Sequence, residues 1–356
     1  MGSGVTKSNA YNWGGVAPQS DFGTPAAAPA RLSKYKDFKG NAKKNFEEDT
    51  GHSGTRNMTQ GIDITGMTAE PEIGGTLKPD EILGDVLRGF FGSCDSTQQA
   101  ETVAYEHIFE ESEDGELLPL SIFQGYNVGT AEEQKPKRFA DQVISKLDFK
   151  FSTKETPTFT ANHAGDFPTF GITEPSLVYP TPRVPPFLAP QIRVYLDEIG
   201  GTIGTTLMPG FMEGDVSLDN QIELDAKHGG DAWETIKDMG DLKVEGGFKR
   251  RHIDTDLQRV WATGAADGTS PVLVNEEYML RYEFTGGMIK DALGVDTIYP
   301  YKFQLDIMNI VITENDPSES GDGARTYDIK WQALPDETGA TATALLQNKI
   351  ATYAAV

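Results

Sequence analysis

The sequence contains only one cysteine, Cys94, and no long apolar run. One cysteine cannot form a disulfide within the chain, which is typical of proteins made in a reducing compartment, so we expect burial alone to hold the fold together. No uncharged apolar segment approaches the roughly 20 residues that a membrane-spanning helix needs, and no apolar segment follows Lys7 as a secretory signal requires. We therefore expect no membrane anchor.

Basic residues are scarce relative to acidic ones. The 356 residues include 31 Lys and Arg against 54 Asp and Glu, for a net charge of −23. Binding along a phosphate backbone needs clustered basic side chains, which argues against a general nucleic-acid binder. With 38% hydrophobic and 24% charged residues, the composition is that of a globular protein, and the length allows about two domains.

Motifs for catalysis and cofactor binding are also missing. The five histidines include no pair at i, i+3 or i, i+4, and the chain has neither a Lys-bearing phosphate loop nor a Gly-x-Ser-x-Gly elbow. No histidine lies close to Cys94 in the sequence to activate it as a nucleophile. Pairs of carboxylates occur in any chain this acidic and do not indicate a glycosidase. We predict a protein that is not an enzyme and has no metal ion or cofactor.

Apolar and polar residues alternate along several stretches, in the pattern of half-buried antiparallel strands. The clearest stretches are 62–64, 147–152, 192–197, 216–224 and 277–284. Glycine-rich segments separate them, as turns between strands would. The sequence therefore predicts a mainly β fold.

Two short helices interrupt the strands. After Pro79 and Asp80, which suit a helix start, Ile82, Val86 and Phe90 fall at i, i+4 and i+8. Ile253, Leu257, Val260 and Trp261 show the same helical spacing. Each helix would lay one apolar stripe on a sheet, so we expect Trp261 in a helix core, and Trp331 in a strand core.

The two helices also belong to an internal repeat. The aligned pairs are Asp85 with Asp256, Val86 with Leu257, Arg88 with Arg259 and Phe90 with Trp261. Three more pairs keep the same order in both halves. A Gly-Gly turn precedes the helix, at 74–75 and 246–247, and the helix is followed by a strand reaching glycine, at 123–125 and 284–286, and by a Leu-Asp strand, at 147–149 and 305–307. A shared order of this kind indicates a tandem duplication.

We predict five segments from this organisation. Residues 1–55 form an N-terminal arm, 56–172 a first β-barrel or sandwich domain, 173–190 a proline-rich linker, 191–338 a second such domain and 339–356 a C-terminal arm. Each domain has one short helix. The N-terminal arm either docks on a partner surface through its aromatic residues or forms a loosely packed tail.

A β-barrel unit with one short helix, a Phe-x-Gly step and a long alternating strand resembles the major tail tube proteins of long-tailed, siphovirus-type bacteriophages. The resemblance covers roughly residues 56–340. It implies rings of barrels that stack into a tube for DNA passage, and a duplicated barrel would need three chains for a ring of six barrels. It further implies a tape measure protein in the lumen, tail terminator and distal tail proteins as partners, a location in the virion, and assembly in the bacterial cytoplasm.

The polar faces of the strands supply candidates for the tube lumen, because an acidic lining repels DNA phosphates. The candidates are Asp148, Asp219, Gln221, Glu223, Glu283 and Asp306. Alternation shows two faces without saying which is the lumen, so these residues can equally lie on a solvated outer face. The candidate contacts between rings are Tyr11, Trp13, Phe22, Leu346, Ile350 and Tyr353. The segments that carry them can instead fold back on their own subunit.

Two other functions remain open from the sequence. The first is a distal tail or baseplate ring protein of the same barrel type, which would form a single ring. The second is a β-sandwich carbohydrate-binding protein or glycosidase, which would need Trp233, Trp261 and Trp331 on an exposed platform.

Overall fold

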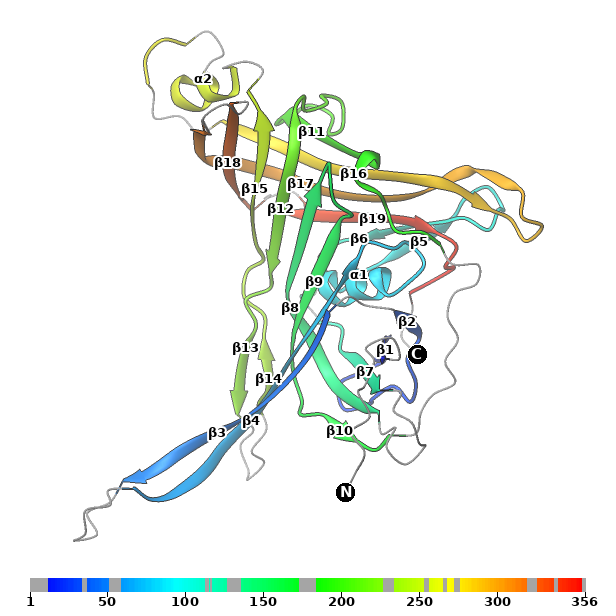
Figure 1. The fold of residues 1–356 in the computed structure, drawn as a ribbon, viewed down its shortest axis with the longest axis vertical. Coiled ribbons are helices and arrows are strands. Elements are labelled where there is room, and N and C mark those ends of the chain that lie inside the picture. Colours follow the sequence, from blue (N-terminus) through cyan, green and yellow to red (C-terminus); the bar gives the residue numbers. More distant parts are fainter. Residues whose placement is uncertain are drawn as a thin grey trace, which may run out of the picture.

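The alternating stretches of sequence form antiparallel strands, so the fold is mainly β as predicted (Figure 1). The structure is a computed structural model. It describes residues 12–33, 37–50, 59–112, 115, 117–126, 136–172, 184–226, 234–252, 256–264, 268–271, 276–318, 325–335 and 339–353.

The first half contains ten strands and one α-helix within the described residues. They are β1 (Asn12–Pro18), β2 (Arg31–Ser33), β3 (Asp37–Thr50), β4 (Thr59–Thr76), α1 (Leu83–Phe91), β5 (Asp95–Gln98), β6 (Tyr105–Phe109), β7 (Leu120–Tyr126), β8 (Lys137–Ser152), β9 (Thr158–Ala164) and β10 (Thr169–Phe170). Helix α1 lies where the spacing of Ile82, Val86 and Phe90 predicts it.

The second half follows a short 3-10 helix, η2 (Ala189–Gln191). Its elements are β11 (Ile192–Glu198), β12 (Phe211–Asp219), β13 (Glu223–Ala226), β14 (Glu234–Asp238), β15 (Lys243–Arg251), α2 (Asp256–Thr263), β16 (Glu277–Lys290), β17 (Asp296–Ser318), β18 (Thr326–Ala333) and β19 (Ala342–Asn348). Of the predicted linker, residues 173–183 lie outside the described residues, and Phe187 packs into the core.

Eight of these strands form one continuous antiparallel row across both halves. Its order is β3–β4–β9–β8–β12–β15–β18–β17. The pairing of β8 with β12 joins the first half to the second. The separation into two domains that the sequence suggests is therefore bridged by main-chain hydrogen bonds.

The same pairings recur in both halves. β3 pairs with β4, β4 with β9, β9 with β8, β8 with β7 and β7 with β1, all antiparallel. In the second half β12 pairs with β15, β15 with β18, β18 with β17, β17 with β16 and β16 with β11, again antiparallel. The two halves thus share one strand order, and β1 occupies the place of β11.

The long strands β8 and β17 take part in two layers. The first part of β8 pairs with β7 and its last part with β9 and β12. At the change of partner, Asp141 has a positive φ of 49°, a conformation uncommon for a side-chain-bearing residue. The Gln19 side chain fixes this corner, because its amide nitrogen donates to Asp141 Oδ1 at 2.7 Å and its oxygen accepts from the Asp141 N–H at 2.8 Å.

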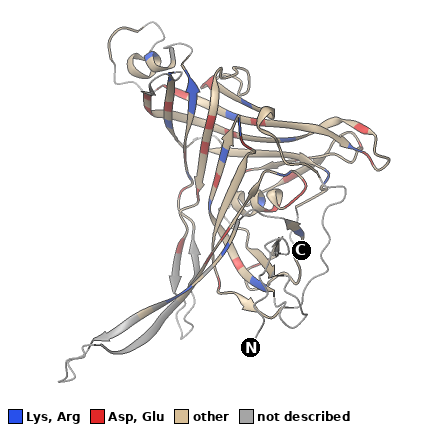
Figure 2. Ribbon diagram, in the orientation of Figure 1, with Lys and Arg blue, Asp and Glu red and all other residues tan. Residues whose placement is uncertain are grey.

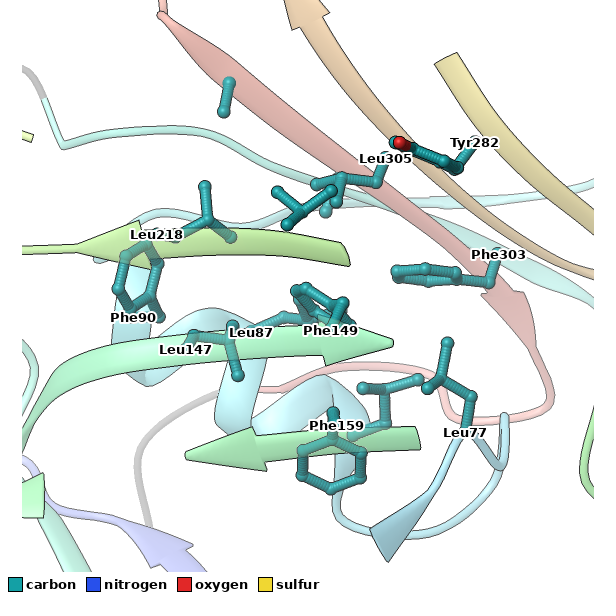
Figure 3. Close-up of a cluster of buried hydrophobic side chains, with 14 of the residues drawn as sticks. Leu77, Leu87, Phe90, Leu147, Phe149, Phe159, Leu218, Tyr282, Phe303 and Leu305 are labelled. Carbon is teal, nitrogen blue, oxygen red and sulfur yellow. The ribbon is translucent and has the colours of Figure 1, made fainter. Parts of the chain in front are cut away.

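A single large apolar core lies between the layers and spans both halves (Figure 3). Phe149 on β8 lies 5.6 Å from Phe303 on β17, between ring centroids, and Phe151 lies 4.6 Å from Tyr282 on β16. All four rings are buried. Each half therefore completes its core with aromatic side chains of the other half.

The terminal segments are part of the fold where the structure describes them, which corrects the expectation of two arms. β1 pairs with β7, and β3 with β4. β19 pairs with β17 of its own half and with β6 of the first half. The reason is apolar burial, because these segments complete the sheets that cover α1 and the shared core.

Three local expectations are also corrected. Both glycine pairs, 74–75 and 246–247, lie inside strands, where a Cβ at Gly246 would overlap the main chain of Asp215. The expected strand 216–224 breaks after Asp219, and Gln221 has a positive φ of 48°. Trp261 is 39% exposed rather than in a core, because α2 lies at the periphery, whereas Trp331 is buried as predicted.

Candidate assembly surface

One face of the eight-strand row packs on the core and the opposite face is solvated. On β18, for example, Tyr327, Ile329 and Trp331 are buried, whereas Asp328 and Lys330 between them are exposed. Period-two alternation is the physical reason, because successive side chains of a strand point to opposite faces. We call this solvated side of the row the charged face.

The charged face carries both signs (Figure 2). Its charged residues include Lys39, Lys43, Glu70, Glu72, Lys146, Asp148, Lys150, Glu213, Asp215, Asp219, Lys243, Glu245, Lys249, Glu314, Asp316, Asp328 and Lys330. Lysine and carboxylate therefore neighbour one another across strands. In this set the carboxylates outnumber the lysines, so the face is acidic in sum, with its charge partly offset by lysine.

Ion pairs join neighbouring strands on the charged face. Lys330 lies 2.6 Å from Glu314, and Lys39 lies 2.8 Å from Glu72. Burial raises the pKa of the Asp215 carboxyl, and the charge of Lys150 opposite lowers it. Exposed pairs of this kind stabilise a fold little, but they reduce the net field of the surface.

The junction between the halves is a ladder of seven opposed residues. Residues 146–152 of β8 lie opposite residues 213–219 of β12. Asn220, directly after β12, is buried at the end of this ladder. Its side-chain amide donates to the main-chain oxygens of Phe90 at 3.2 Å and Ile144 at 3.1 Å and so links β12 to the first half. The two halves are thus joined by backbone pairing and by a buried polar clamp.

Both ends of the eight-strand row are open in the described part of the chain. β3 pairs there only with β4, and residues 312–318 of β17 pair only with β18. The indole nitrogen of Trp261 donates to the main-chain oxygen of Ile312 at 3.0 Å, at the start of this open stretch. Unpaired strand edges are templates for pairing with another chain. Since neighbours are antiparallel throughout, the two end strands run in opposite directions.

The six residues predicted for the lumen do not lie on one surface of the structure. Asp148 and Asp219 lie on the charged face, on paired strands at the junction. Gln221 and Glu223 follow β12 and are exposed. Glu283 pairs with Lys302 at 3.0 Å, and Asp306 is 6% exposed and held by Arg281 through two hydrogen bonds of 2.7 Å. Asp306 is therefore a buried ion-pair partner and not a solvated surface residue.

The residues predicted to join rings are mostly buried in their own chain. Trp13, Leu346 and Tyr353 are buried, and Ile350 packs partly against the core. Phe22 is 46% exposed, and Tyr11 lies outside the described residues. The segments that carry Trp13, Leu346 and Tyr353 therefore fold back on their own subunit.

An exposed apolar tip was missed in the sequence. The β16–β17 hairpin projects from the body and exposes Leu293 by 88%, Ile298 by 80% and Val295 by 61% (Figure 1). The signal available was a run of apolar residues around the turn glycine Gly294, which has a positive φ of 82°. Contiguous exposed apolar side chains commonly mark a protein contact.

The tryptophans do not form the platform that a sugar-binding protein needs. Trp331 is buried and the indole N–H of Trp261 is hydrogen-bonded to β17, while Trp233 lies outside the described residues. In the described part of the chain, no three His, Cys, Asp or Glu side chains are grouped so as to hold a metal ion. No helix there has the length and apolarity to cross a membrane.

The continuous antiparallel sheet and its charged face define a mainly β protein. Residues 14–333 match the family of phage tail tube proteins, and the chain belongs to this family. It is therefore a structural component of a phage tail, and the family expected from the sequence is confirmed. No curated protein matches the chain. The tandem duplication stays a prediction.

Proposed function

We propose that this protein assembles into rings that stack to form the tail tube, a channel through which DNA passes into the host. The observation that carries the proposal is the eight-strand row with open ends of opposite direction. Joining such ends head to tail closes a ring without leaving an exposed edge, provided that the rotation between copies returns to its start. On the expectation of a duplicated barrel, three chains form each ring.

The charged face lines the channel in this assembly. The other face of the row packs on the core, beneath the layer that contains β1, β7, β11 and β16. A closed ring has more room outside than inside, so the two-layered side with its projecting hairpin lies outside and the charged face inside. Cross-strand ion pairs then let the lining pass DNA without clustered cations that would hold the phosphates.

The apolar tip of the β16–β17 hairpin provides contact between stacked rings. It brings three strongly exposed apolar side chains together in one turn, whereas Trp13, Leu346 and Tyr353 are buried. Burying these side chains against the next ring would stabilise stacking by removing apolar surface from water.

The further partners follow from the family and not from the geometry. A tape measure protein occupies the lumen during assembly, and terminator and distal tail proteins bind the ends of the tube. Assembly takes place in the cytoplasm of the bacterial host, and the finished protein is part of the virion.

Negative-stain microscopy of the purified chain, together with mass measurement by light scattering, tests the proposal. Hollow tubes with a channel of roughly 20 Å or more, wide enough for duplex DNA, are the expected result. Rings with the mass of three chains support the ring composition. Single rings that never stack at any concentration favour a distal tail or baseplate ring, and a chain that stays monomeric at high concentration and in the presence of preformed tube ends contradicts the proposal.

A further inference from the structure

The β16–β17 hairpin is anchored to the body of the molecule next to its apolar tip. Ile289 near the end of β16 is fully buried and Tyr301 on β17 is 9% exposed, whereas Leu293, Val295 and Ile298 between them project into solvent. Both strands of the hairpin thus carry buried side chains beside the exposed turn.

A carboxylate of the first half holds the β17 side of this base. The Tyr301 hydroxyl donates to Oδ2 of Asp80, which lies between β4 and α1, at 3.1 Å. The Lys349 N–H, directly after β19, donates to Asp80 Oδ1 at 3.3 Å. Burial raises the pKa of the Asp80 carboxyl, and these two hydrogen bonds lower it. One carboxylate therefore joins the hairpin, the segment before α1 and the C-terminal segment.

Two further contacts tie the hairpin to neighbouring elements. The Gln347 side-chain amide on β19 donates to the main-chain oxygen of Pro300 at 2.6 Å. On the β16 side, the Phe187 ring lies 6.0 Å from the Phe284 ring, between centroids, and the Phe187 N–H donates to the main-chain oxygen of Leu77 at 2.9 Å. Contacts thus reach the first half from both strands of the hairpin.

The turn itself also has a fixed shape. The Asp291 carboxylate accepts from the N–H groups of Leu293 at 2.9 Å and Val295 at 2.8 Å, and the Asp291 N–H donates to the main-chain oxygen of Val295 at 2.8 Å. A preorganised group loses less conformational entropy when it binds than a mobile one. The same apolar side chains therefore bind more tightly on an anchored hairpin than on a hairpin that swings.

We propose that Asp80 positions the apolar tip for its contact with the next ring, by holding Tyr301 at the base of the hairpin. This inference rests on the proposed function. Of the anchors described above, the Asp80–Tyr301 hydrogen bond is the one that joins a side chain of the hairpin to a side chain of the first half. It therefore sets the direction of the hairpin relative to the first half. Asp80 acts through Tyr301 and is not itself part of the contact.

Removal of one hydroxyl in the full-length chain tests the proposal. Tyr301→Phe deletes the hydrogen bond to Asp80 and keeps the ring. The matched control is Tyr327→Phe on β18, because Tyr327 is also buried and its hydroxyl donates to Gln258 Oε1 of α2 at 3.2 Å. Hydrogen–deuterium exchange of residues 288–300 is measured below the concentration at which tubes form, and sedimentation then gives the critical concentration for tube formation.

Both measurements are expected to respond to Tyr301→Phe. One hydrogen bond typically shifts an equilibrium by a small factor, so we expect exchange of residues 288–300 and the critical concentration each to rise about fivefold. Tyr327→Phe should change each by less than about twofold, because its hydrogen bond lies at α2. An equal rise in exchange at β8 would show a general loss of stability and overturn the positioning role.

A double-mutant cycle tests whether Asp80 and Tyr301 act as one unit. Asp80→Ala should raise exchange of residues 288–300 at least as much as Tyr301→Phe does. Adding Tyr301→Phe to Asp80→Ala should then change this exchange by less than about twofold, since the shared bond is already lost. Effects that multiply independently would overturn the link between the two residues.

The remaining outcomes separate this inference from the proposed function. Unchanged exchange in Tyr301→Phe overturns the inference whatever the chain assembles into. Raised exchange with an unchanged critical concentration also overturns it, and the stacking role of the tip stands if Leu293→Ser with Ile298→Ser still shortens the tubes. A parent chain that never assembles contradicts the proposed function, and the exchange data alone then decide whether Asp80 orients the hairpin.

Discussion

The two halves of the molecule share a strand order but bury their helices differently. Helix α1 lies against β8, β1 and β6 and is buried along nearly its whole length. Helix α2 lies against β17, with Trp261 39% exposed (Figure 1). The same order of strands thus accommodates a helix inside the molecule and a helix at its edge.

The difference comes from what covers each helix. Both ends of the chain meet over α1, where Arg31 of β2 forms an ion pair with the fully buried Asp85 and donates to the main-chain oxygen of Thr352 at 3.0 Å. The Tyr353 ring packs on Gly84, where a Cβ would overlap it. In the described residues no comparable segment covers α2. Strand order is the same for both helices. A helix therefore becomes buried only where a terminal segment, such as that with Tyr353, packs over it.

The largest expected effect is on the core that the halves share. Phe149→Ala removes a ring that lies against Phe303 of the other half, and we expect the free energy of unfolding to fall by about 4 kcal/mol. Urea unfolding monitored by tryptophan fluorescence and by far-UV circular dichroism measures it. Because the core is continuous, both signals should change in one transition. Two separate transitions, with only the first shifted by the substitution, would show that the halves are independent. Phe46→Ala on β3, where the ring is 59% exposed, is the control.

The ion pair over α1 is expected to give the next effect, and it depends on pH. Burial raises the pKa of Asp85 to about 6, although Arg31 lowers it. The carboxyl is thus largely protonated in the folded state below pH 6, so its contribution to stability falls as pH rises through 6. Arg31→Ala leaves the charged form without its partner, and we expect a loss of about 3 kcal/mol at pH 8.

The same variant should lose far less at pH 5, where Asp85 is protonated. Denaturant titrations at pH 5 and pH 8 test this, with Asp85→Asn in the Arg31→Ala background as the control that removes the charge. An equal loss at both pH values would contradict the assignment of the effect to the Asp85 charge.

A smaller effect is expected where the C-terminal segment meets α1. Gly84→Ala places a Cβ against the Tyr353 ring and should lower the free energy of unfolding by about 2 kcal/mol, since overpacking displaces the ring. Trp261→Ala on α2 should cost about 1 kcal/mol, mainly through its hydrogen bond to Ile312. Thermal unfolding of both variants ranks them, and a larger loss for Trp261→Ala would reverse the comparison between the helices.

The smallest effect on folding is expected at the apolar tip of the second half. Leu293→Ser with Ile298→Ser changes exposed side chains, so the free energy of unfolding should change by less than about 0.5 kcal/mol. Tube length in electron micrographs should nevertheless fall sharply while single rings persist. Asp291→Asn in the same turn is a poor control because its carboxylate accepts from the Leu293 and Val295 N–H groups, so Lys290→Gln is preferred. Tubes of normal length would exclude the tip from ring stacking.

The strands and helices were predictable because they are local. Alternation predicted the buried faces of β8 and β16, and helical spacing predicted α1. Alignment by sequence failed at the level of single residues, since it matched Asp148 with Asp306, whereas Asp148 lies opposite β9 and β12 and Asp306 lies opposite β16 and β19. The physical reason is that β17 is 23 residues long and β8 only 16, so the Leu-Asp motif lies near the end of β8 but near the middle of β17, where the neighbouring strands differ.

By itself the sequence determined the mainly β fold and the two faces of each strand, because side-chain periodicity and local propensity are properties of neighbouring residues. The family was expected from a resemblance and is shown by the match over residues 14–333. Only the tertiary structure decided that β8 pairs with β12, that β3 and the end of β17 each have one open edge within the described residues, and that Trp13 and Tyr353 are buried. Partners such as β8 and β12 lie far apart in the chain, and the backbone groups that join them are nearly the same in every residue. Which edges meet is therefore set by how the whole apolar core is covered.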